Sequence, residues 1–154
     1  MIRTGVAFST LALVAIPSIA QAPFAKDSPV LDDVRATAFR HYMPKEGSNI
    51  REKVVCFAAD KELSDEFLGR FSLKSVKIVR ASECEVGVFG VRLKGTRDFG
   101  VLTSIESVTW ISGTEAEVRG GNYWSGWGAT YSTLRIVYRK GKWVTKSETI
   151  TGVS

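Results

Sequence analysis

The segment LRIVYRKGKWVTKSET, Leu134–Thr149, predicts the last β-hairpin of the chain and with it the fold class. Apolar, aromatic and β-branched residues are frequent in both halves of the segment, which is typical of strands. Between the halves lies Lys140-Gly141-Lys142, and a glycine between two such runs favours a tight turn. We therefore expect Leu134–Arg139 to pair with Trp143–Thr149, as part of an antiparallel β-meander at the C-terminus.

The same β pattern extends upstream as far as Val76. Runs rich in β-branched and aromatic residues alternate with glycine-containing turns throughout this region. We expect strands in VKIVRA (76–81), VGVFGVRL (86–93), GVLTSIESVTW (100–110), TEAEVRG (114–120), ATYSTLRIVYR (129–139) and KWVTKSETIT (142–151). Each of these runs is predicted to form a single strand.

The segment DSPVLDDVRATAFRHYM, residues 27–43, predicts the main helix. Ser28 can cap its N-terminus, Pro29 suits the first helical position, and two aspartates in the first turn complement the helix dipole. Apolar residues recur at three- and four-residue steps and form one stripe, made of Val30, Leu31, Val34, Ala38, Phe39 and Tyr42. The stripe is expected to pack on a sheet, with Arg35 and Arg40 pointing elsewhere.

Two shorter elements are predicted between this helix and the β region. KVVCFAA, residues 53–59, is apolar and β-branched, which indicates a buried strand. LSDEFLGRF, residues 63–71, offers Ser64 as a helix N-cap followed by two acidic residues, so it predicts one or two helical turns that end near Gly69. The whole pattern predicts an α+β fold, in which one N-terminal helix packs on a curved, cone-like antiparallel sheet.

The first residues predict export. Met1–Gly5 carries one basic residue, Arg3, and is followed by the apolar run Val6–Ile16 and a series of small residues. This order is typical of a secretory signal peptide, and the apolar run is much shorter than the roughly 20 residues that span a bilayer. We expect cleavage after Ala20, because cleavage after Ala22 would leave proline as the first mature residue. The product, residues 21–154, is expected to be a single domain in the periplasm or outside the cell, without a membrane anchor.

Export changes how the two cysteines are interpreted. Cys56 and Cys84 are the only cysteines of the chain, and an exported protein with one pair is expected to join them in a disulfide. A metal site or a reactive thiol is the alternative. Both are disfavoured because the chain has no CxxC motif and a single histidine.

The net charge does not indicate a nucleic-acid partner. The chain has 21 basic and 16 acidic residues, and the loss of Arg3 with the signal peptide leaves 20 and 16, or +4. These charges are interspersed, whereas a nucleic-acid surface needs a concentrated basic stripe. No motif for a cofactor, a metal or a phosphate loop can be assembled from the sequence.

Several segments resemble known families. YRKGKWVTK (138–146) resembles the last hairpin of small cone-shaped domains of the NTF2-like and cystatin-like kind. ASEC (81–84), VTWISGTEAEVRGGNYWSGWGATY (108–131) and YRKGKWV (138–144) together are similar to a set of small exported bacterial proteins without an assigned function. The resemblance implies the α+β fold and carries no catalytic residues. NTF2-like enzymes place an Asp and a His or Tyr inside the cone, whereas the single histidine here, His41, lies on the predicted helix.

The segment GGNYWSGWGATY, Gly120–Tyr131, is the candidate binding site. Its glycines suit a hairpin connection or bulge. In the structural interpretation, Trp124 and Tyr131 fill the core. In the functional interpretation, Trp127 and Tyr123 are exposed anchors for a partner protein or a sugar. The predicted binding residues are Tyr123, Trp124, Ser125, Trp127 and Tyr131. SGWGATY (125–131) is also similar to the Ser-Gly-x-x-x-Tyr-type loop of C-type lysozyme inhibitors.

Candidate catalytic groups are sparse. His41 could act as a base, but Asp32 and Asp33 lie two helical turns away, so its partner would have to come from another element. Glu115 and Glu117 would lie on one face of a strand, roughly 7 Å apart, and the simplest interpretation is that both are solvated. No Ser-His-Asp or Cys-His arrangement can be assembled.

These observations favour binding over catalysis. The leading hypothesis is a small exported binding or interaction protein, with a protein or a small envelope ligand as partner. One alternative is an inhibitor or immunity-type protein that acts against a cell-wall hydrolase or toxin. Another is an NTF2-like enzyme with a pocket under the first helix. Binding predicts an exposed apolar patch, and catalysis predicts an enclosed cavity with a titratable group whose pKa is shifted.

Overall fold

The computed structural model describes residues 28–45, 52–126 and 128–154. The predicted signal peptide, residues 1–20, lies outside these residues. The helices are α1 (Pro29–Tyr42) and α2 (Asp65–Leu68), and a short 3-10 turn, η1, covers Ala81–Glu83. The strands are β1 (Val54–Ala58), β2 (Lys77–Arg80), β3 (Cys84–Gly87), β4 (Gly90–Leu93), β5 (Phe99–Ser112), β6 (Glu115–Ser125), β7 (Gly128–Arg139) and β8 (Lys142–Val153). None of the described helices is long and apolar enough to cross a membrane.

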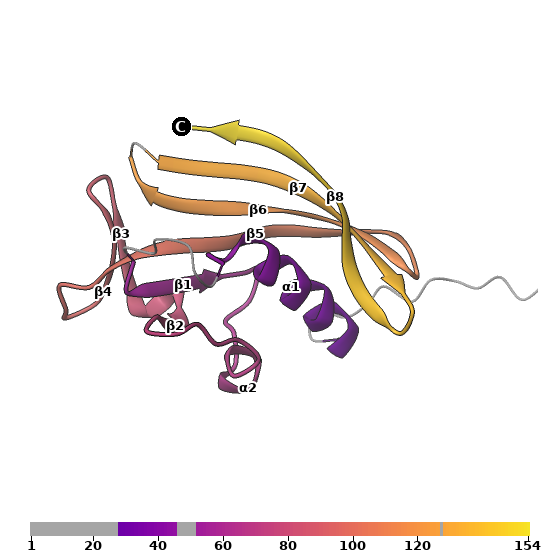
Figure 1. Cartoon of the computed structure of the whole chain (residues 1–154), viewed down its shortest axis with the longest axis horizontal. Coiled ribbons are helices and arrows are strands. Elements are labelled where there is room, and N and C mark those ends of the chain that lie inside the picture. The colour runs from indigo at the N-terminus through magenta and orange to yellow at the C-terminus, as the bar shows by residue number, and fades with distance from the viewer. Residues whose placement is uncertain (1–27, 46–51, 127) are drawn as a thin grey trace, which may run out of the picture.

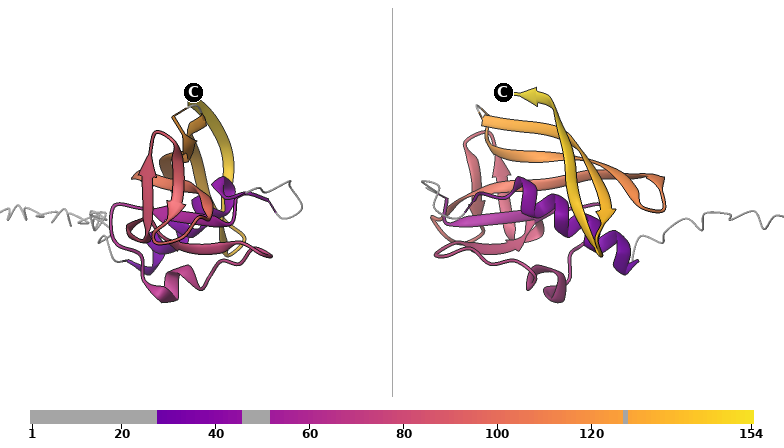
Figure 2. Two further views of the ribbon diagram at one scale, coloured as in Figure 1. Left: turned by 90° about the vertical axis from the view of Figure 1, so that its left-hand side faces the viewer. Right: turned by 45° about the vertical axis from the view of Figure 1, so that its right-hand side comes forward.

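The strands form one open, mixed sheet with one main helix against it. The strand order is β2-β1-β5-β6-β7-β8, and β3 and β4 are attached through β5. The long strands β5–β8 curve, and α1 lies against one of their faces while the turn of the β7–β8 hairpin bends past it (Figures 1 and 2). The predicted α+β class is confirmed at this level.

The prediction of a purely antiparallel sheet is wrong at β1. This strand is parallel to both of its neighbours, β2 and β5. A parallel pair needs a long crossover connection, and the segment from residue 59 to 76, which includes α2, supplies one between β1 and β2. The short helix predicted from Ser64 forms as expected, since the Ser64 hydroxyl accepts a hydrogen bond from the amide of Phe67 at 3.1 Å.

The C-terminal meander forms as predicted. Arg139 pairs with Lys142, and Leu134 pairs with Glu148. Lys140 and Gly141 make the turn with φ angles of 50° and 80°. Two successive positive φ angles are those of a type I′ turn, whose twist matches that of the flanking strands.

Residues 86–93, predicted as one strand, form two. β3 and β4 make a tight hairpin in which Gly87 pairs with Gly90, and Val88 and Phe89 are the two turn residues. Gly90 has a φ of 129°, which side-chain-bearing residues rarely adopt. The glycines on either side of Val88-Phe89 therefore break the predicted strand.

Gly120 and Gly121 lie inside β6, so the glycine-rich segment extends a strand before it turns. A Cβ atom on Gly120 would lie 2.2 Å from the carbonyl oxygen of Ser104, and one on Gly121 would lie 2.0 Å from that of Thr130. The two glycines are needed here for close approach of neighbouring strands. Their φ angles are not positive.

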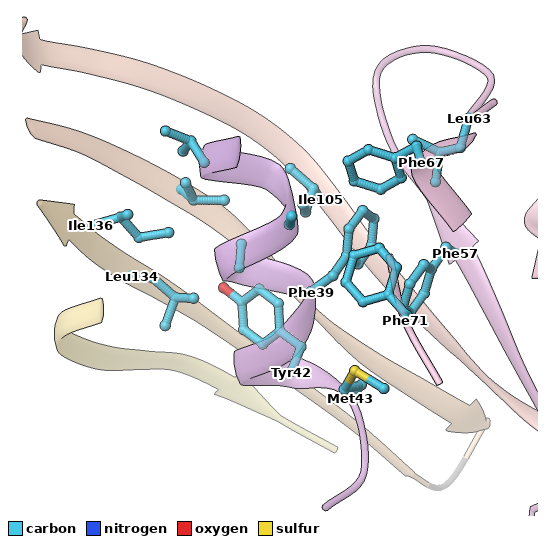
Figure 3. Close-up of a cluster of buried hydrophobic side chains, with 14 of the residues drawn as sticks. Phe39, Tyr42, Met43, Phe57, Leu63, Phe67, Phe71, Ile105, Leu134 and Ile136 are labelled. Atoms are coloured by element: carbon cyan, nitrogen blue, oxygen red, sulfur yellow. The ribbon is translucent and has the colours of Figure 1, made fainter. Parts of the chain in front are cut away.

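The main core lies between α1 and the sheet. Phe39 of α1 stacks on Phe57 of β1 with ring centroids 4.1 Å apart, and Phe67 and Phe71 make edge contacts with Phe39 at 6.0 and 6.1 Å (Figure 3). Five of the six predicted stripe residues are buried, and Val30 is half-buried; the buried ones are Leu31, Val34, Ala38, Phe39 and Tyr42. The helix stripe therefore meets both the sheet and the α2 segment.

Arg35 does not point away from the core, contrary to the prediction. Its side chain is fully buried, and its guanidinium forms ion pairs with Asp32 at 2.8 Å and with Asp60 at 2.6 Å. A buried cation is tolerated only when it is paired and hydrogen-bonded. The pairing with Asp60 joins α1 to the segment that follows β1.

The predicted disulfide forms between Cys56 on β1 and Cys84 on β3. Cys56 belongs to a second, smaller core together with Val54, Val79, Cys84 and Val91. Side chains alternate along β1, so this core lies on the face opposite Val55 and Phe57, which belong to the main core. The disulfide therefore fixes the β3–β4 hairpin against the face of β1 that α1 does not cover.

Candidate functional site

Two turns meet at one end of the sheet. One is Val86–Gly90 of the β3–β4 hairpin, and the other is Tyr123–Gly126 at the end of β6. We call these two segments together the two-hairpin tip. The second segment is part of the glycine-rich stretch that the sequence marks as a candidate binding site.

Direct contacts join the two turns. The Tyr123 hydroxyl donates a hydrogen bond to the carbonyl of Gly87 at 3.0 Å, and the amide of Gly126 donates one to the carbonyl of Val88 at 2.9 Å. Gly90 lies so close to the other turn that a Cβ atom on it would be 3.2 Å from the carbonyl oxygen of Trp124. The two turns therefore form one surface rather than two independent loops.

This surface exposes large apolar side chains. Phe89 is 90% exposed, Val88 67% and Val86 50%. Phe99, at the start of β5, is 50% exposed and lies under the guanidinium of Arg92, which is 4.4 Å from the ring centroid. Single exposed apolar residues are ordinary, but a cluster of them marks a contact surface.

The base of the tip is anchored in both cores. The Trp124 side chain is half-buried against the main core, and Tyr123 is half-buried against the smaller core. The Cys56–Cys84 disulfide ends at the first residue of β3, four positions before Val88. A surface held in this way loses little conformational entropy when a partner binds.

The structure brings three of the five predicted binding residues together. Tyr123, Trp124 and Ser125 lie in the tip, and Trp127 lies outside the described residues. Tyr131 lies apart, opposite Gly121 in the β6–β7 ladder, and is 37% exposed. The interpretation that Tyr131 fills the core is therefore wrong.

Strand alternation explains the position of Tyr131. Ser132 and Leu134 on the same strand are buried, and Leu134 belongs to the main core beneath α1. Odd-numbered residues in this part of β7 consequently face away from α1. The ring of Tyr131 packs beside Gly152 of β8, where a Cβ atom on the glycine would lie 3.7 Å from the ring.

The sequence interpretation missed the exposed side chains of the β3–β4 turn, because it treated residues 86–93 as one strand. The sequence Gly87-Val88-Phe89-Gly90 did contain a signal for this turn. Two glycines that flank two residues are compatible with a two-residue hairpin loop, in which the two central side chains cannot both be buried. Phe89 is the most exposed large apolar residue among those described.

His41 has its partner on another element, as its helix position required. Its Nε2 donates to Glu148 Oε2 at 3.0 Å, and Glu148 Oε1 accepts a hydrogen bond from the Ser132 hydroxyl at 2.7 Å. The hydroxyl of Tyr42 in turn donates to the carbonyl of Ser132 at 3.0 Å. The carboxylate lies between the serine and the histidine, so the histidine is not placed to take the serine proton, as nucleophilic catalysis requires. The chain of contacts links α1 to β7 and β8.

This network predicts a loss of stability in acid. The Ser132 hydrogen bond, followed by that from His41, holds the pKa of Glu148 below its usual value of 4.5 despite partial desolvation. A depressed pKa stabilises the fold above the unfolded-state pKa, and this contribution is lost as the pH falls through the folded-state pKa. We expect Glu148→Gln to lower the free energy of unfolding at pH 7, with a difference from the wild type that shrinks below about pH 4.5. Urea unfolding of both proteins between pH 3 and pH 7 measures this difference in unfolding free energy.

Glu66→Gln serves as the control for this experiment, since Glu66 is an exposed carboxylate on α2. Glu66→Gln should change the free energy of unfolding only slightly throughout the pH range. If the difference between wild type and Glu148→Gln stayed constant from pH 3 to pH 7, the network would not be the source of the acid dependence.

The simplest interpretation of the sequence was that Glu115 and Glu117 are both solvated. In the structure, both carboxylates instead lie beside Arg135. Glu115 accepts a hydrogen bond from Arg135 at 2.7 Å, and Glu117 lies 3.9 Å from the same guanidinium. The Arg135 hydrogen bond holds the pKa of Glu115 below its usual value. Among the described residues, no group of three or more His, Cys, Asp or Glu side chains is placed to hold a metal ion.

Comparisons of the chain with protein-family models, with curated proteins and with solved structures find no match. The two-hairpin tip carries Phe89, the most exposed large apolar side chain among the described residues.

Proposed function

We propose that this chain is an exported binding protein that docks a protein partner through the two-hairpin tip. The observation that carries the proposal is Phe89, an aromatic side chain 90% exposed on a turn that is hydrogen-bonded to a second turn. Aromatic anchors at the centre of a contact surface supply much of the binding energy of protein complexes. The tip combines such an anchor with a fixed backbone.

The composition of the tip supports a partner with an uncharged, apolar recess. Neither Val86–Gly90 nor Tyr123–Gly126 contains an Asp, Glu, Lys or Arg residue. The fully buried centre of a protein interface is depleted of charged residues in the same way, while aromatic residues are enriched. Binding would bury Val88 and Phe89 and leave Arg92 at the rim.

One class of protein that fits this proposal is the inhibitors of cell-wall hydrolases. A protruding, preorganised hairpin can enter an enzyme cleft without paying a large ordering cost. The similarity of residues 125–131 to the loop of C-type lysozyme inhibitors points in the same direction, and Ser125 lies in the tip. Tyr131, the last residue of that segment, lies outside it. We therefore place Val88 and Phe89 at the centre of the contact.

The enzyme alternative has less support. Its pocket was expected under the first helix, but in the described part of the chain Phe39, Tyr42, Leu134 and Ile136 fill this space (Figure 3). Burial raises the pKa of Tyr42 to about 12, so its hydroxyl stays protonated at neutral pH and serves as a hydrogen-bond donor to Ser132. The cone-like NTF2 or cystatin relationship is likewise our interpretation, and the binding proposal does not depend on it.

Export is part of the proposal. The Cys56–Cys84 disulfide is compatible with an oxidising compartment. The signal-peptide pattern of residues 1–20 supports the same destination. The partner is accordingly expected among proteins of the cell envelope or its surroundings.

Phe89→Ala is expected to weaken partner binding strongly while the fold stays intact. Loss of an aromatic anchor typically weakens a complex by about 2–4 kcal/mol, whereas removal of an exposed side chain changes the free energy of unfolding by less than about 0.5 kcal/mol. Oxidised protein, recovered from cells that express the full chain, is used as bait in an envelope extract. Each captured protein is then purified and titrated against the wild type and the variant.

Ile111→Ala is the matched control. Ile111 is also a large exposed apolar residue, and it lies near the β5–β6 turn at the opposite end of β6 from the tip. A partner that binds the wild type and Ile111→Ala, but binds Phe89→Ala at least about tenfold more weakly, supports the proposal. A partner bound equally by all three, or no partner at all, contradicts it.

A further inference from the structure

Basic side chains from three separate elements gather on the opposite side of the molecule from the tip. Arg40 lies in the last turn of α1, Arg70 follows α2, and Lys142 begins β8. They line an open cleft of about 280 Å³ together with Tyr138 and Trp143. We call this the basic cleft. The sequence shows these charges as interspersed, and the fold brings them together.

The β7–β8 turn bends past α1 (Figure 2), and its residues Gly141 and Lys142 line one side of the cleft. The Thr37 hydroxyl lies 3.5 Å from the carbonyl oxygen of Trp143, which keeps the turn beside the helix. Arg139 and Lys140, next to the cleft residue Gly141, are also exposed and basic. A basic turn therefore lies beside α1, at the point where Thr37 contacts Trp143.

The positive charge of the cleft is compensated only in part. Arg70 forms an ion pair with Asp33, the one acidic residue that lines the cleft. Among the described residues, no carboxylate forms an ion pair with Arg40 or Lys142. Both side chains therefore keep donors for an anion.

Arg40 is held in position even without an ionic partner. Its Nη2 donates to the carbonyl of Arg70 at 3.4 Å, and its guanidinium lies 5.2 Å from the centroid of the Phe71 ring. A second open cleft of about 370 Å³ shares Arg40 and Arg70 and adds Lys45. A fixed guanidinium between two clefts is well suited to bind a phosphate or sulfate group, because its planar set of donors matches these oxyanions.

Aromatic side chains form the other wall. Tyr138 is 46% exposed, and its ring centroid lies 5.3 Å from that of Trp143. Exposed amphipathic rings pack against the C–H faces of sugar rings while their polar groups stay in water. The cleft volume is near the lower end of the range for small-molecule sites, which fits a single sugar unit.

We propose that the basic cleft binds a sugar that carries a phosphate or sulfate group. Arg40 and Lys142 receive the oxyanion, and Tyr138 receives the sugar ring. The site is separate from the two-hairpin tip, so its ligand does not depend on the protein partner proposed above. A phosphate and a sulfate offer the same oxyanion chemistry to the arginine, and the experiment compares both.

The test is a calorimetric titration of oxidised protein, recovered from cells that express the full chain, with glucose 6-phosphate, glucose 6-sulfate, glucose and inorganic phosphate. We expect the sugar phosphate and the sugar sulfate to bind with dissociation constants of about 0.1–1 mM, given the ligand size. Glucose should not bind measurably, and inorganic phosphate should bind about tenfold more weakly, because each lacks one half of the recognised structure.

Arg40→Gln and Lys142→Gln are each expected to weaken the sugar phosphate about tenfold. Arg97→Gln, which removes an exposed arginine in the β4–β5 connection, is the control and should bind like the wild type. Lys142 is exposed and its replacement leaves the Arg40–Phe71 contact intact, so that variant separates ligand loss from loss of folding.

Three results with these ligands would overturn the proposal, and a fourth would come from DNA. The first is no binding of either charged sugar up to about 10 mM, far above the expected constants. The second is equal affinity in the wild type, Arg40→Gln and Lys142→Gln. The third is inorganic phosphate bound as tightly as the sugar phosphate, which would remove the role of Tyr138. A short DNA duplex that binds more tightly than the sugar phosphate would replace the proposal with a nucleic-acid surface.

Discussion

Simultaneous replacement of Asp32 and Asp60 by asparagine is expected to lower the free energy of unfolding by about 3–5 kcal/mol. Both carboxylates are partly exposed, but the Arg35 guanidinium that they neutralise is fully buried. The double variant would remove both of these carboxylates from a buried cation, and their negative charge would no longer offset the cost of its desolvation. Urea unfolding, monitored by tryptophan fluorescence, measures the difference.

Arg35→Met is the matched comparison. Methionine replaces the buried charge with an apolar side chain of similar length, and both aspartates can return to water. We expect the free energy of unfolding to change by less than about 1.5 kcal/mol, because an apolar replacement of a buried ion pair is often neutral or stabilising. Equal losses in Arg35→Met and in the double asparagine variant would show that packing, and not charge, determines the stability at this position.

The features that the sequence predicted well depend on neighbours along the chain. The Lys140-Gly141 turn forms because Gly141 readily adopts a positive φ angle between two strand-forming runs. Ser64 caps a helix that begins at the next residue. The stripe on α1 follows from helical periodicity alone, and Phe39 in it is fully buried.

The features that it missed depend on distant parts of the chain. Arg35 lies off the apolar stripe, and its burial follows from Asp60, which lies 25 residues away. The parallel pairing of β1 follows from the crossover through α2, which a strand pattern cannot reveal. In the sequence, Val55 and Cys56 belong to a single apolar run. In the structure, they belong to two cores on opposite faces of β1.

The candidate site was partly visible in the sequence. The aromatic residues near Tyr123 identified one of the two turns, because large rings beside glycines are unusual in a connection. The other turn lies about 36 residues earlier in the chain, and tertiary contacts, among them the hydrogen bonds from Tyr123 to Gly87 and from Gly126 to Val88, join the two turns. The gathering of Arg40, Arg70 and Lys142 around one cleft has the same origin in tertiary contacts.

The Cys56→Ala/Cys84→Ala variant is expected to lose about 3.5 kcal/mol of unfolding free energy. The disulfide closes a loop with a sequence separation of 28 residues, and a crosslink of this span removes that amount of loop-closure entropy from the unfolded chain. For a domain of this size the loss is a large fraction of the total stability. Thermal and urea unfolding of the variant, beside the wild type with and without a reducing agent, measure it.

The same variant tests whether the disulfide also organises the two-hairpin tip. Cys84 is the first residue of β3, and the turn between β3 and β4 carries the exposed Val88 and Phe89. At a temperature where the variant is still folded, we expect its affinity for the captured partner to fall, because the β3–β4 hairpin becomes free to move and binding must then order it. Hydrogen exchange should increase in β3 and β4 and stay unchanged in β7. Unchanged affinity together with a loss of about 3.5 kcal/mol would mean that the crosslink acts on the unfolded chain alone. The hydrogen bonds from Tyr123 and Gly126 would then suffice to hold the tip.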